Sequence, residues 1–434
     1  MKKKLMSIVL GAVMAISLAA CGGSTGGATI ESTETQEETT EAEAPAADAA
    51  ADAAAEGTEA EAAGDNFHIG IVTGSVSQSE DDRRGAEAFQ QKYGEENVTL
   101  AIYPDNFTEE QETTIQTIVN LSDDPDMKAI IVNQAVPGTT EAFRRIKEKR
   151  PDILCIAGES HEDLPEIGSA ADLVVNNDFV SRGYLMIRTA HELGCKTFVH
   201  ISFPRHMSYE TMSRRVAIMK EACKEFGMEF AMETAPDPTT DVGVPGAQAY
   251  ILEHVPEWIE KYGTDSAYFC TNDAHTEPLL KMLLEHGGYF IEADLPSPLM
   301  GYPGALGIDL TAEAGDFQKI LAKVEQAVVE KGGAGRFGTW AYSYGYTVSA
   351  GLAEHARNVI LGTSELTDID AISQAYGVFS PGAEWNGANY TNVDTGVKAD
   401  NTILIYQDTY IMGDPGYYMG ATKVEVPEKY YTVK

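Results

Sequence analysis

The sequence predicts an α/β fold in which two doubly wound lobes are joined by a hinge. From residue 66 onward, short apolar runs alternate with longer amphipathic segments, which is typical of strand–helix repeats. The runs are rich in Ile, Val, Leu and Phe without polar alternation, as expected of parallel strands covered on both faces. The roughly 370 residues of this part are too many for one sheet of this kind, so two lobes are predicted.

The first lobe is predicted from four strands separated by helices. The predicted strands are "FHIGIVTG", "VTLAIYPDN", "KAIIVNQ" and "DILCIAGES", at residues 67–74, 98–106, 128–134 and 152–160. A helix is predicted after each of the first three strands. Ser77 and Glu80 have the spacing of a capping box, which favours a helix start directly after the first strand.

The same repeat returns in the second half of the chain. Strands are predicted at 196–204, 228–236 and 266–273, with helices at 209–226, 246–262 and up to His286. Between the two sets, an apolar strand ends in Asn176-Asn177-Asp178 before another helix, which suits a crossing between lobes. The predicted division is therefore a first lobe of about 66–176 and 304–400 and a second lobe of about 177–303. The role of residues 363–434 is left open.

The N-terminus has the pattern of an export signal. Three lysines precede an apolar stretch from Leu5 to Leu18, and Ala19-Ala20 then precede Cys21. Residues 1–21 resemble a bacterial lipoprotein signal with its lipobox, which implies an acyl chain such as palmitate on Cys21 and a lipid anchor at the extracytoplasmic face of the cell membrane. An ordinary secretory signal is the alternative. Residues 22–65 contain no Lys, Arg or aromatic residue, so a disordered acidic tether is expected.

The net charge argues against one class of function, and the cysteine spacing argues against disulfides. The formal net charge of −36 argues against nucleic-acid binding, which relies on neutralising phosphates. Four cysteines follow Cys21, none of them in a C-x-x-C pair, so free and mostly buried thiols are expected at Cys155, Cys195, Cys223 and Cys270.

Four segments together resemble the type I periplasmic binding protein superfamily. They are "IGIVTGSVSQSEDDRRGAEAF", "VVNNDFVSRGYLMIRTAHELG", "YFCTNDAHTEPLLKMLLEHG" and "GTWAYSYGYTVSAGLAEHARNVILG", in that order along residues 69–362. The resemblance implies two Rossmann-like lobes that close on a small ligand, and it fits an uncharacterised branch of bacterial solute-binding lipoproteins. The long segment after residue 362 departs from the sugar-binding members of the superfamily.

Candidate ligand-binding residues follow from the same arrangement, because residues just past the carboxyl ends of parallel strands line the ligand crevice. They are Thr73, Ser75, Ser77, Asn133, Gln134, Asn177, Arg205, Asn272, Asp273, His275, Tyr302, Trp340 and Tyr342. Arg205 suits a carboxylate or phosphate. The aromatic rings at 302, 340 and 342 suit stacking on a sugar ring or base, with core packing as the alternative. Glu159 and His161, after the fourth strand, are as consistent with a surface loop as with ligand contact.

The polar turn at residues 271–277 has more than one interpretation. It can line the cleft, and Asp273 or Thr276 can also cap the following helix. A metal or catalytic site is a further alternative, although the Asp-x-His-x-Glu spacing differs from the helical H-E-x-x-H pattern.

The leading functional hypothesis is a membrane-tethered solute-binding lipoprotein that captures a small polar ligand, such as a sugar or nucleoside, for an ABC importer. No Walker loop or H-E-x-x-H pattern is present, so neither an enzyme nor a cofactor is predicted. A sensory receptor that reports to a membrane signalling partner is an alternative. An exported metal-dependent hydrolase using His161, His275 and nearby acids is a second alternative.

Overall fold

The computed structural model describes residues 67–434. Cys21, the predicted signal at 1–21 and the predicted tether at 22–65 lie outside the described residues, as do the side chains of Ser77 and Gln78.

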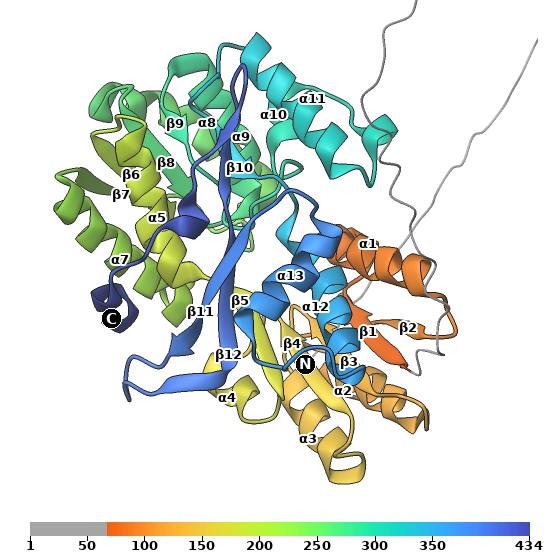
Figure 1. The fold of residues 1–434 in the computed structure, drawn as a ribbon. Helices are drawn as coiled ribbons and strands as arrows, with labels where there is room; N and C mark the ends of the chain where they lie inside the picture. Colours follow the sequence, from red (N-terminus) through yellow and green to blue (C-terminus); the bar gives the residue numbers. More distant parts are fainter. Residues whose placement is uncertain (1–66) are drawn as a thin grey trace, which may run out of the picture. The chain divides into compact units, whose positions relative to one another are not determined.

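The first lobe is built on a seven-stranded sheet with the strand order β11-β12-β5-β4-β3-β1-β2 (Figure 1). Strands β1 to β5 are parallel, β12 is parallel to β5, and β11 is antiparallel to β12. All residues of β1, β3 and β5 are buried, as expected for strands covered on both faces. The bounds are β1 Ile69–Thr73, β2 Val98–Ile102, β3 Ala129–Asn133, β4 Leu154–Gly158, β5 Leu173–Asn177, β11 Trp385–Thr391 and β12 Lys398–Gln407.

Helices cover both faces of this sheet. The chain runs from β1 to β2 in one direction and then from β3 to β5 in the other. Because such connections are right-handed, α1 lies on one face and α2, α3 and α4 lie on the other. Helix α12 packs against α1 and over β1, β3 and β4. The bounds are α1 Val76–Tyr93, α2 Gln111–Asn120, η1 Leu121–Asp123, α3 Thr139–Lys149, α4 Leu164–Gly168, α12 Tyr344–Ile360 and α13 Ile369–Phe379.

The second lobe has a four-stranded parallel sheet with the order β7-β6-β8-β9. Phe198 and Phe269 pack in the core that includes α5 and α7, whereas Val199 and Tyr268 pack in the core that includes α8 and α9. Both faces are therefore covered, and the predicted doubly wound α/β fold is confirmed. The bounds are α5 Phe179–Glu192, β6 Thr197–Ser202, α6 Pro204–Met207, α7 Glu210–Phe226, β7 Glu229–Thr234, α8 Gly243–Tyr262, β8 Ser266–Cys270, α9 Asp273–His286 and β9 Tyr289–Phe290.

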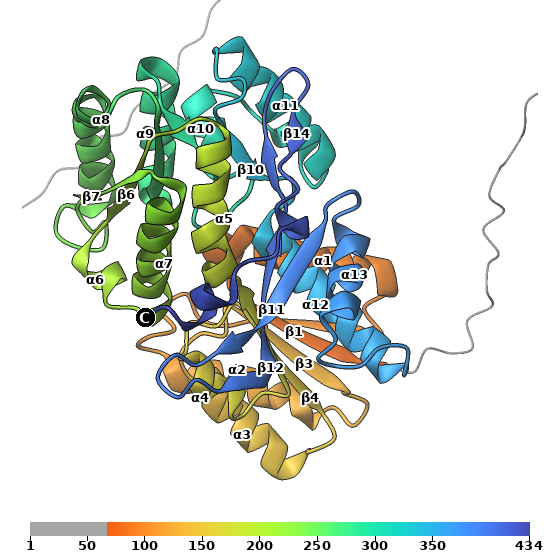
Figure 2. The same ribbon diagram turned by 60° about the vertical axis from the view of Figure 1, so that its left-hand side comes forward.

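The return to the first lobe comes later than predicted. Phe317 and Val324 lie in the core of the second lobe, so residues 304–337 belong with that lobe and not with the first. The chain re-enters the first lobe between β10 and α12. Figure 2 shows α10 and α11 beside β10. The bounds are α10 Tyr302–Leu306, η2 Thr311–Glu313, α11 Phe317–Glu330 and β10 Gly338–Trp340.

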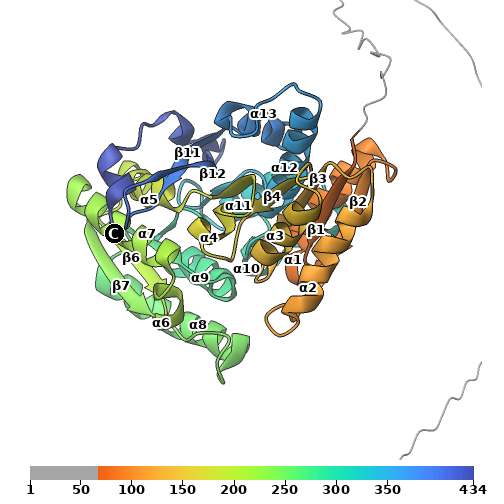
Figure 3. The ribbon, with the colours of Figure 1, turned by 90° about the horizontal axis from the view of Figure 1, so that it is seen from below.

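The C-terminal segment, whose role the sequence left open, contributes to both lobes. Strands β11 and β12 extend the first sheet beyond β5, and β13 and β14 join β10 in a three-stranded antiparallel sheet. The last residues then run along α5 and α7, where Tyr430 packs against Tyr184, and the C-terminus is next to α7 in Figure 3. The bounds are β13 Thr409–Ile411, β14 Tyr417–Tyr418, η3 Ala421–Lys423 and η4 Glu428–Thr432.

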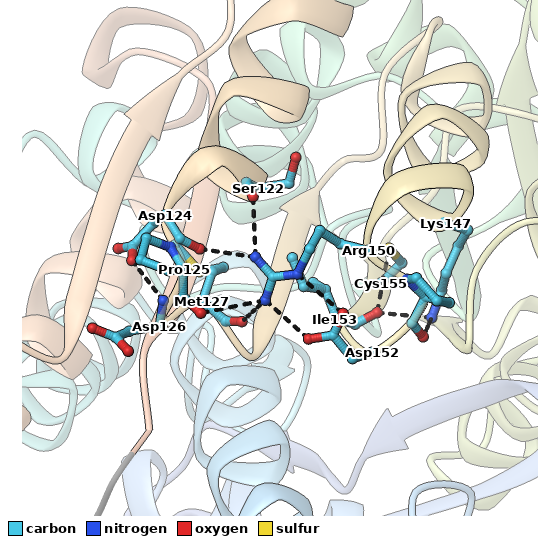
Figure 4. A network of polar contacts seen from close by, with 11 residues as sticks. Ser122, Asp124, Pro125, Asp126, Met127, Lys147, Arg150, Asp152, Ile153 and Cys155 are labelled. Atoms are coloured by element: carbon cyan, nitrogen blue, oxygen red, sulfur yellow. Dashed lines mark hydrogen bonds and ion pairs between the residues drawn. The ribbon is translucent and has the colours of Figure 1, made fainter.

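A polar network at the amino edge of the first sheet is structural (Figure 4). Arg150, just after α3, donates to the carbonyl oxygens of Ser122, Asp124 and Met127 at 3.3, 3.1 and 3.2 Å and to the carboxylate of Asp152 at 2.9 and 3.0 Å. This edge carries the starts of β3 and β4. The network therefore lies opposite the carboxyl edge, where a ligand is expected.

Cys155, Cys195, Cys223 and Cys270 are free and buried, as predicted. No helix within residues 67–434 is long and apolar enough to cross a bilayer.

Candidate ligand-binding site

Two loops at the carboxyl edge of the first sheet have an unusual backbone. Gln134 and Ala135 after β3 and Glu159 after β4 have positive φ angles of 60°, 22° and 46°, and they are the only non-glycine residues of 67–434 that do. L-residues rarely adopt this conformation, and such strain is concentrated at functional sites. The loops after β3 and β4 are therefore the first indication of a site.

Gln134 connects its loop to the start of α1. Its Nε2 donates to Ser79 Oγ and to Asp82 Oδ2, both at 2.7 Å. Asp82 is buried, and this burial, aided by the nearby carboxylates of Asp81 and Glu159, raises its pKa to about 7 against the opposing effect of the Gln134 hydrogen bond. Two acids of the first lobe, Asp82 and Glu159, are thus close enough to interact.

Glu159 is held next to the crossover into the second lobe. Its Oε2 accepts a 2.8 Å hydrogen bond from the backbone N–H of Asn177, the last residue of β5. Burial raises the pKa of Glu159, and the carboxylate of Asp294, which follows β9 in the second lobe, raises it further. The carboxyl edges of the two sheets therefore meet at this point.

An ion pair between Arg182 and Glu292 ties the crossing segments together. Arg182 of α5 donates from Nε to Glu292 Oε1 at 2.6 Å, and both side chains are at most 3% exposed. Arg182 also donates to Asn177 Oδ1 at 2.8 Å and to the carbonyl oxygens of residues 293 and 294 at 2.8 and 2.9 Å. Glu292 Oε2 accepts from Trp340 Nε1 of β10 at 3.0 Å. We call this set the crossover junction.

The second lobe adds further charge beside the junction. Asp294 forms a 2.5 Å ion pair with Arg215 of α7, and Arg215 is only 3% exposed. Asp273 begins α9, and desolvation by the surrounding protein, together with the charge of Asp294, raises its pKa to about 7. Carboxyl groups with pKa values raised in this way are common at functional sites.

One buried donor at the junction, Asn177 Nδ2, has no hydrogen-bond partner within residues 67–434, and its residue is only 6% exposed. The Tyr344 hydroxyl is buried next to Glu159, and burial, followed by the charge of Glu159 and a hydrogen bond to that carboxylate, raises the pKa of Tyr344. Buried donors without acceptors are rare in folded proteins, so Asn177 Nδ2 points to an external partner.

The structure brings Gln134, Asn177 and Asp273 to this region, and their ligand contact stays a prediction. Three other predicted residues form side-chain hydrogen bonds within the protein. Thr73 Oγ1 donates to the carbonyl of Gly74 at 2.9 Å, Ser75 Oγ donates to Asp105 at 2.6 Å, and Asn133 Nδ2 donates to Ser349 of α12. The side chain of Ser77 is not described.

The prediction that Tyr302, Trp340 and Tyr342 stack on a ligand ring is wrong. Trp340 and Tyr302 are at most 1% exposed, and the Tyr302 hydroxyl donates to the carbonyl of Gly338 at 2.7 Å. Tyr342 is 6% exposed, and its hydroxyl donates to the carbonyl of Pro381 at 2.8 Å. The alternative of core packing is confirmed, because apolar neighbours surround all three rings.

The turn at 271–277 is also corrected in detail. Asn272 caps α9, with its Oδ1 accepting from the N–H of Ala274 at 3.0 Å, so neither Asp273 nor Thr276 is the cap. His275 is buried, and its Nε2 lies 3.0 Å from the carbonyl oxygen of Pro236, which keeps it out of the junction. The guanidinium of Arg205 is ion-paired with Asp237, with Nε and Nη2 donating to the two carboxylate oxygens at 2.7 and 3.0 Å.

Sequence reasoning missed Arg182, Glu292 and Asp294. Arg182 lies within a helix, where a solvated position is the default, and β9 has only two residues, so its carboxyl end gave no clear strand signal. The two acids in "IEAD", which follows "GGYF", were the available hint. Within residues 67–434, no three His, Cys, Asp or Glu side chains converge so as to hold a metal ion.

The raised pKa of Asp82 gives a pH prediction. In the folded state Asp82 keeps its proton up to about pH 7, whereas the unfolded chain releases it near the ordinary value of 3.8. The free energy of unfolding should therefore decrease as pH rises through this window. In Asp82→Asn, which cannot titrate, this decrease between pH 4 and pH 8 should be smaller by roughly 1–3 kcal/mol. Urea denaturation from pH 4 to pH 8 measures this. Asp241→Asn, at an exposed site, is the matched control. An unchanged slope in Asp82→Asn would contradict the assignment.

Two parallel α/β lobes whose strand ends meet at shared crossovers define the class: this is a type I periplasmic-binding-protein-like fold, as the sequence segments suggested. A protein of Clostridium difficile 630, provisionally described as a transcriptional regulator, has the same fold with a TM-score of 0.72 at 23% identity, covering 80% of this chain and 99% of that one. A sugar ABC transporter protein of Actinomyces odontolyticus ATCC 17982 gives a TM-score of 0.50 at 10% identity, covering 83% and 98%.

The family model described as "Protein of unknown function (DUF3798)" matches residues 67–338, and the chain belongs to this family. A second family model matches residues 349–433. An uncharacterized protein of Treponema pallidum (strain Nichols) is 43% identical over 209 residues, which is 48% of this chain and 94% of that protein.

Proposed function

We propose that this protein is a solute receptor that captures a small polar ligand between its two lobes. The observation that carries the proposal is a buried donor at the crossover between the lobes, Asn177 Nδ2, which has no hydrogen-bond partner within residues 67–434. Leaving such a group unbonded costs about 1–3 kcal/mol. Binding of a ligand that supplies a hydrogen-bond acceptor would therefore be favoured, and the ligand would contact both lobes.

The receptor acts at the extracytoplasmic face of the membrane in this proposal, anchored by lipid on Cys21, and delivers its ligand to an ABC permease. The support is the Leu18-Ala19-Ala20-Cys21 pattern after a short apolar stretch. The fold supports the same class of function, since it is shared with a sugar ABC transporter protein. A sugar, a nucleoside or a similar metabolite is the expected kind of ligand.

One preparation tests both parts of the proposal. Full-length protein extracted gently from cells grown with an alkyne fatty acid is expected to carry the lipid label and, in native mass spectrometry, a bound small molecule. Cys21→Ala should lose the label, because the acyl acceptor is gone, and keep the bound molecule. The result that contradicts anchoring is an equal label in the variant. Wild-type protein that carries no small molecule, and takes up none from a cell metabolite extract, contradicts the receptor function.

A further inference from the structure

The end of the chain, residues 420–434, is attached to the first lobe at its start and to the second lobe at its end. We call this segment the C-terminal strap. At its start, the N–H of Gly420 donates to Asp408 at 2.9 Å, and the carbonyl of Thr422 accepts from Asn386 Nδ2 of β11 at 2.7 Å. Asp408 directly follows β12, so these contacts hold the strap at the β11–β12 edge of the first sheet.

The strap then runs past α5 and ends beside α7, both in the second lobe (Figure 2). Tyr430 is fully buried, and the centroids of its ring and of the Tyr184 ring in α5 are 4.9 Å apart. The Tyr430 hydroxyl donates to Glu225 of α7 at 2.7 Å, and Lys429 forms an ion pair with the same carboxylate at 2.5 Å. Apolar burial and polar contacts therefore both attach the strap to the second lobe.

Arg214 of α7 joins this end of the strap directly to the first lobe. Its guanidinium donates to the carbonyl oxygens of Tyr431 and Val433 in the strap at 2.7 and 3.1 Å. It also donates to the carbonyl oxygen of Thr391, the last residue of β11, at 3.1 Å. Hydrogen bonds from a charged donor are stronger than neutral ones, and burial of Arg214 limits their screening by solvent.

These contacts add a link between the lobes to those made by the peptide chain itself. The chain passes from one lobe to the other between β5 and α5, between β10 and α12, and between β12 and β13. Short connecting segments can absorb the backbone changes of a hinge motion. Arg214 and Thr391 are instead 177 positions apart and lie on regular elements of different lobes. A rotation that separates α7 from β11 must therefore break their hydrogen bond.

We propose that the C-terminal strap limits how far the two lobes can rotate apart. The proposal concerns the motion of the protein without ligand. One consequence rests on the receptor function proposed above: lobes with a narrow range of motion lose less conformational freedom when a ligand joins them, so the strap also strengthens ligand capture.

Double electron–electron resonance on the dialysed full chain measures the range of distances between the lobes. Spin labels are attached to Thr108→Cys, before α2 of the first lobe, and to Asp241→Cys, before α8 of the second, because both positions are exposed. Cys21 is replaced by Ala in this background, and Cys155, Cys195, Cys223 and Cys270 are buried.

Arg214→Ala removes three hydrogen bonds of the strap and should raise the fraction of molecules outside the wild-type distance range roughly 10-fold. Glu225→Ala removes two contacts of the strap at a partly exposed side chain and should broaden the distribution less. Lys224→Ala breaks an exposed pair within the same helix and should leave the distribution unchanged.

Urea denaturation shows which variants are folded, and Glu225→Ala alone decides the matter if Arg214→Ala does not fold. A distribution as narrow as that of the wild type in every folded strap variant overturns the proposal. The receptor function is decided separately, by whether wild-type protein carries or takes up a small molecule. Failure of one proposal is therefore distinguishable from failure of the other.

Discussion

Glu292→Ala is expected to lower the free energy of unfolding by about 3–5 kcal/mol, because it leaves the guanidinium of Arg182 buried without a counter-charge. Glu292 is 2% exposed and accepts hydrogen bonds from Arg182 at 2.6 Å, from Trp340 at 3.0 Å and from Thr409 at 3.3 Å. These partners come from α5, β10 and β13, so the substitution loosens several crossing segments together. Urea denaturation followed by tryptophan fluorescence measures the change.

Two further variants separate charge from packing at this site. Arg182→Met combined with Glu292→Leu removes both charges and keeps apolar volume, so it should recover part of the lost stability. Glu313→Ala breaks a partly exposed ion pair with Lys323 and should cost about 1 kcal/mol or less. If Glu292→Ala costs no more than Glu313→Ala, the junction does not hold the lobes together as described.

Arg214→Ala is expected to lower the free energy of unfolding by about 2–4 kcal/mol, since it leaves three part-buried carbonyl groups without a charged donor. Arg214 of α7 is 2% exposed. It donates to the carbonyl oxygens of Val433 at 3.1 Å, Tyr431 at 2.7 Å and Thr391 at 3.1 Å. One side chain thus joins a second-lobe helix to the end of β11 and to the last residues of the chain.

Hydrogen exchange distinguishes this role from a general loss of stability. Arg214→Ala should speed amide exchange first in residues 428–434 and at the end of β11, at denaturant-free conditions where the rest of the protein stays protected. Arg214→Lys keeps the charge but not the planar fork, so an intermediate effect is expected. Arg84→Ala, at an exposed helical pair, is the control. If exchange in Arg214→Ala is faster by the same factor throughout the protein, Arg214 does not specifically hold the C-terminal residues and the end of β11 in place.

Much of the fold was predictable from the sequence because its signals are local. Unbroken apolar runs separated by amphipathic segments reflect strands buried on both faces, and the structure has such strands at β1, β3, β5, β6 and β8. The crossover at residues 176–178 was also predicted, since a strand that ends in polar residues before a helix needs no information from elsewhere in the chain. The late return, between β10 and α12, could not be predicted, because α11 is an amphipathic helix that could cover either lobe.

The candidate site was predictable only as a region. The strand-end rule selected Gln134, Asn177 and Asp273, which the structure brings to the same region, because carboxyl ends of parallel strands share an edge whatever the side chains are. It could not show that the Thr73 and Ser75 hydroxyls have partners at residues 74 and 105, or that the amide nitrogen of Asn133 donates to Ser349. A residue's type shows that it can bind a ligand, but its neighbours in space decide whether its polar atoms are still free to do so.

The sequence by itself determined the fold class, the two-lobed organisation and the edge at which polar side chains gather, since each follows from periodicity and chain order. Tertiary structure alone decided that Trp340 is buried against Glu292, that Arg182 joins the crossing segments, and that Glu159 of the first lobe is close enough to Asp294 of the second for their charges to interact. Arg182 and Glu292 are 110 positions apart in the chain. Electrostatic and hydrogen-bond energies depend on distance and burial, and folding brings such positions together in ways that no local pattern records.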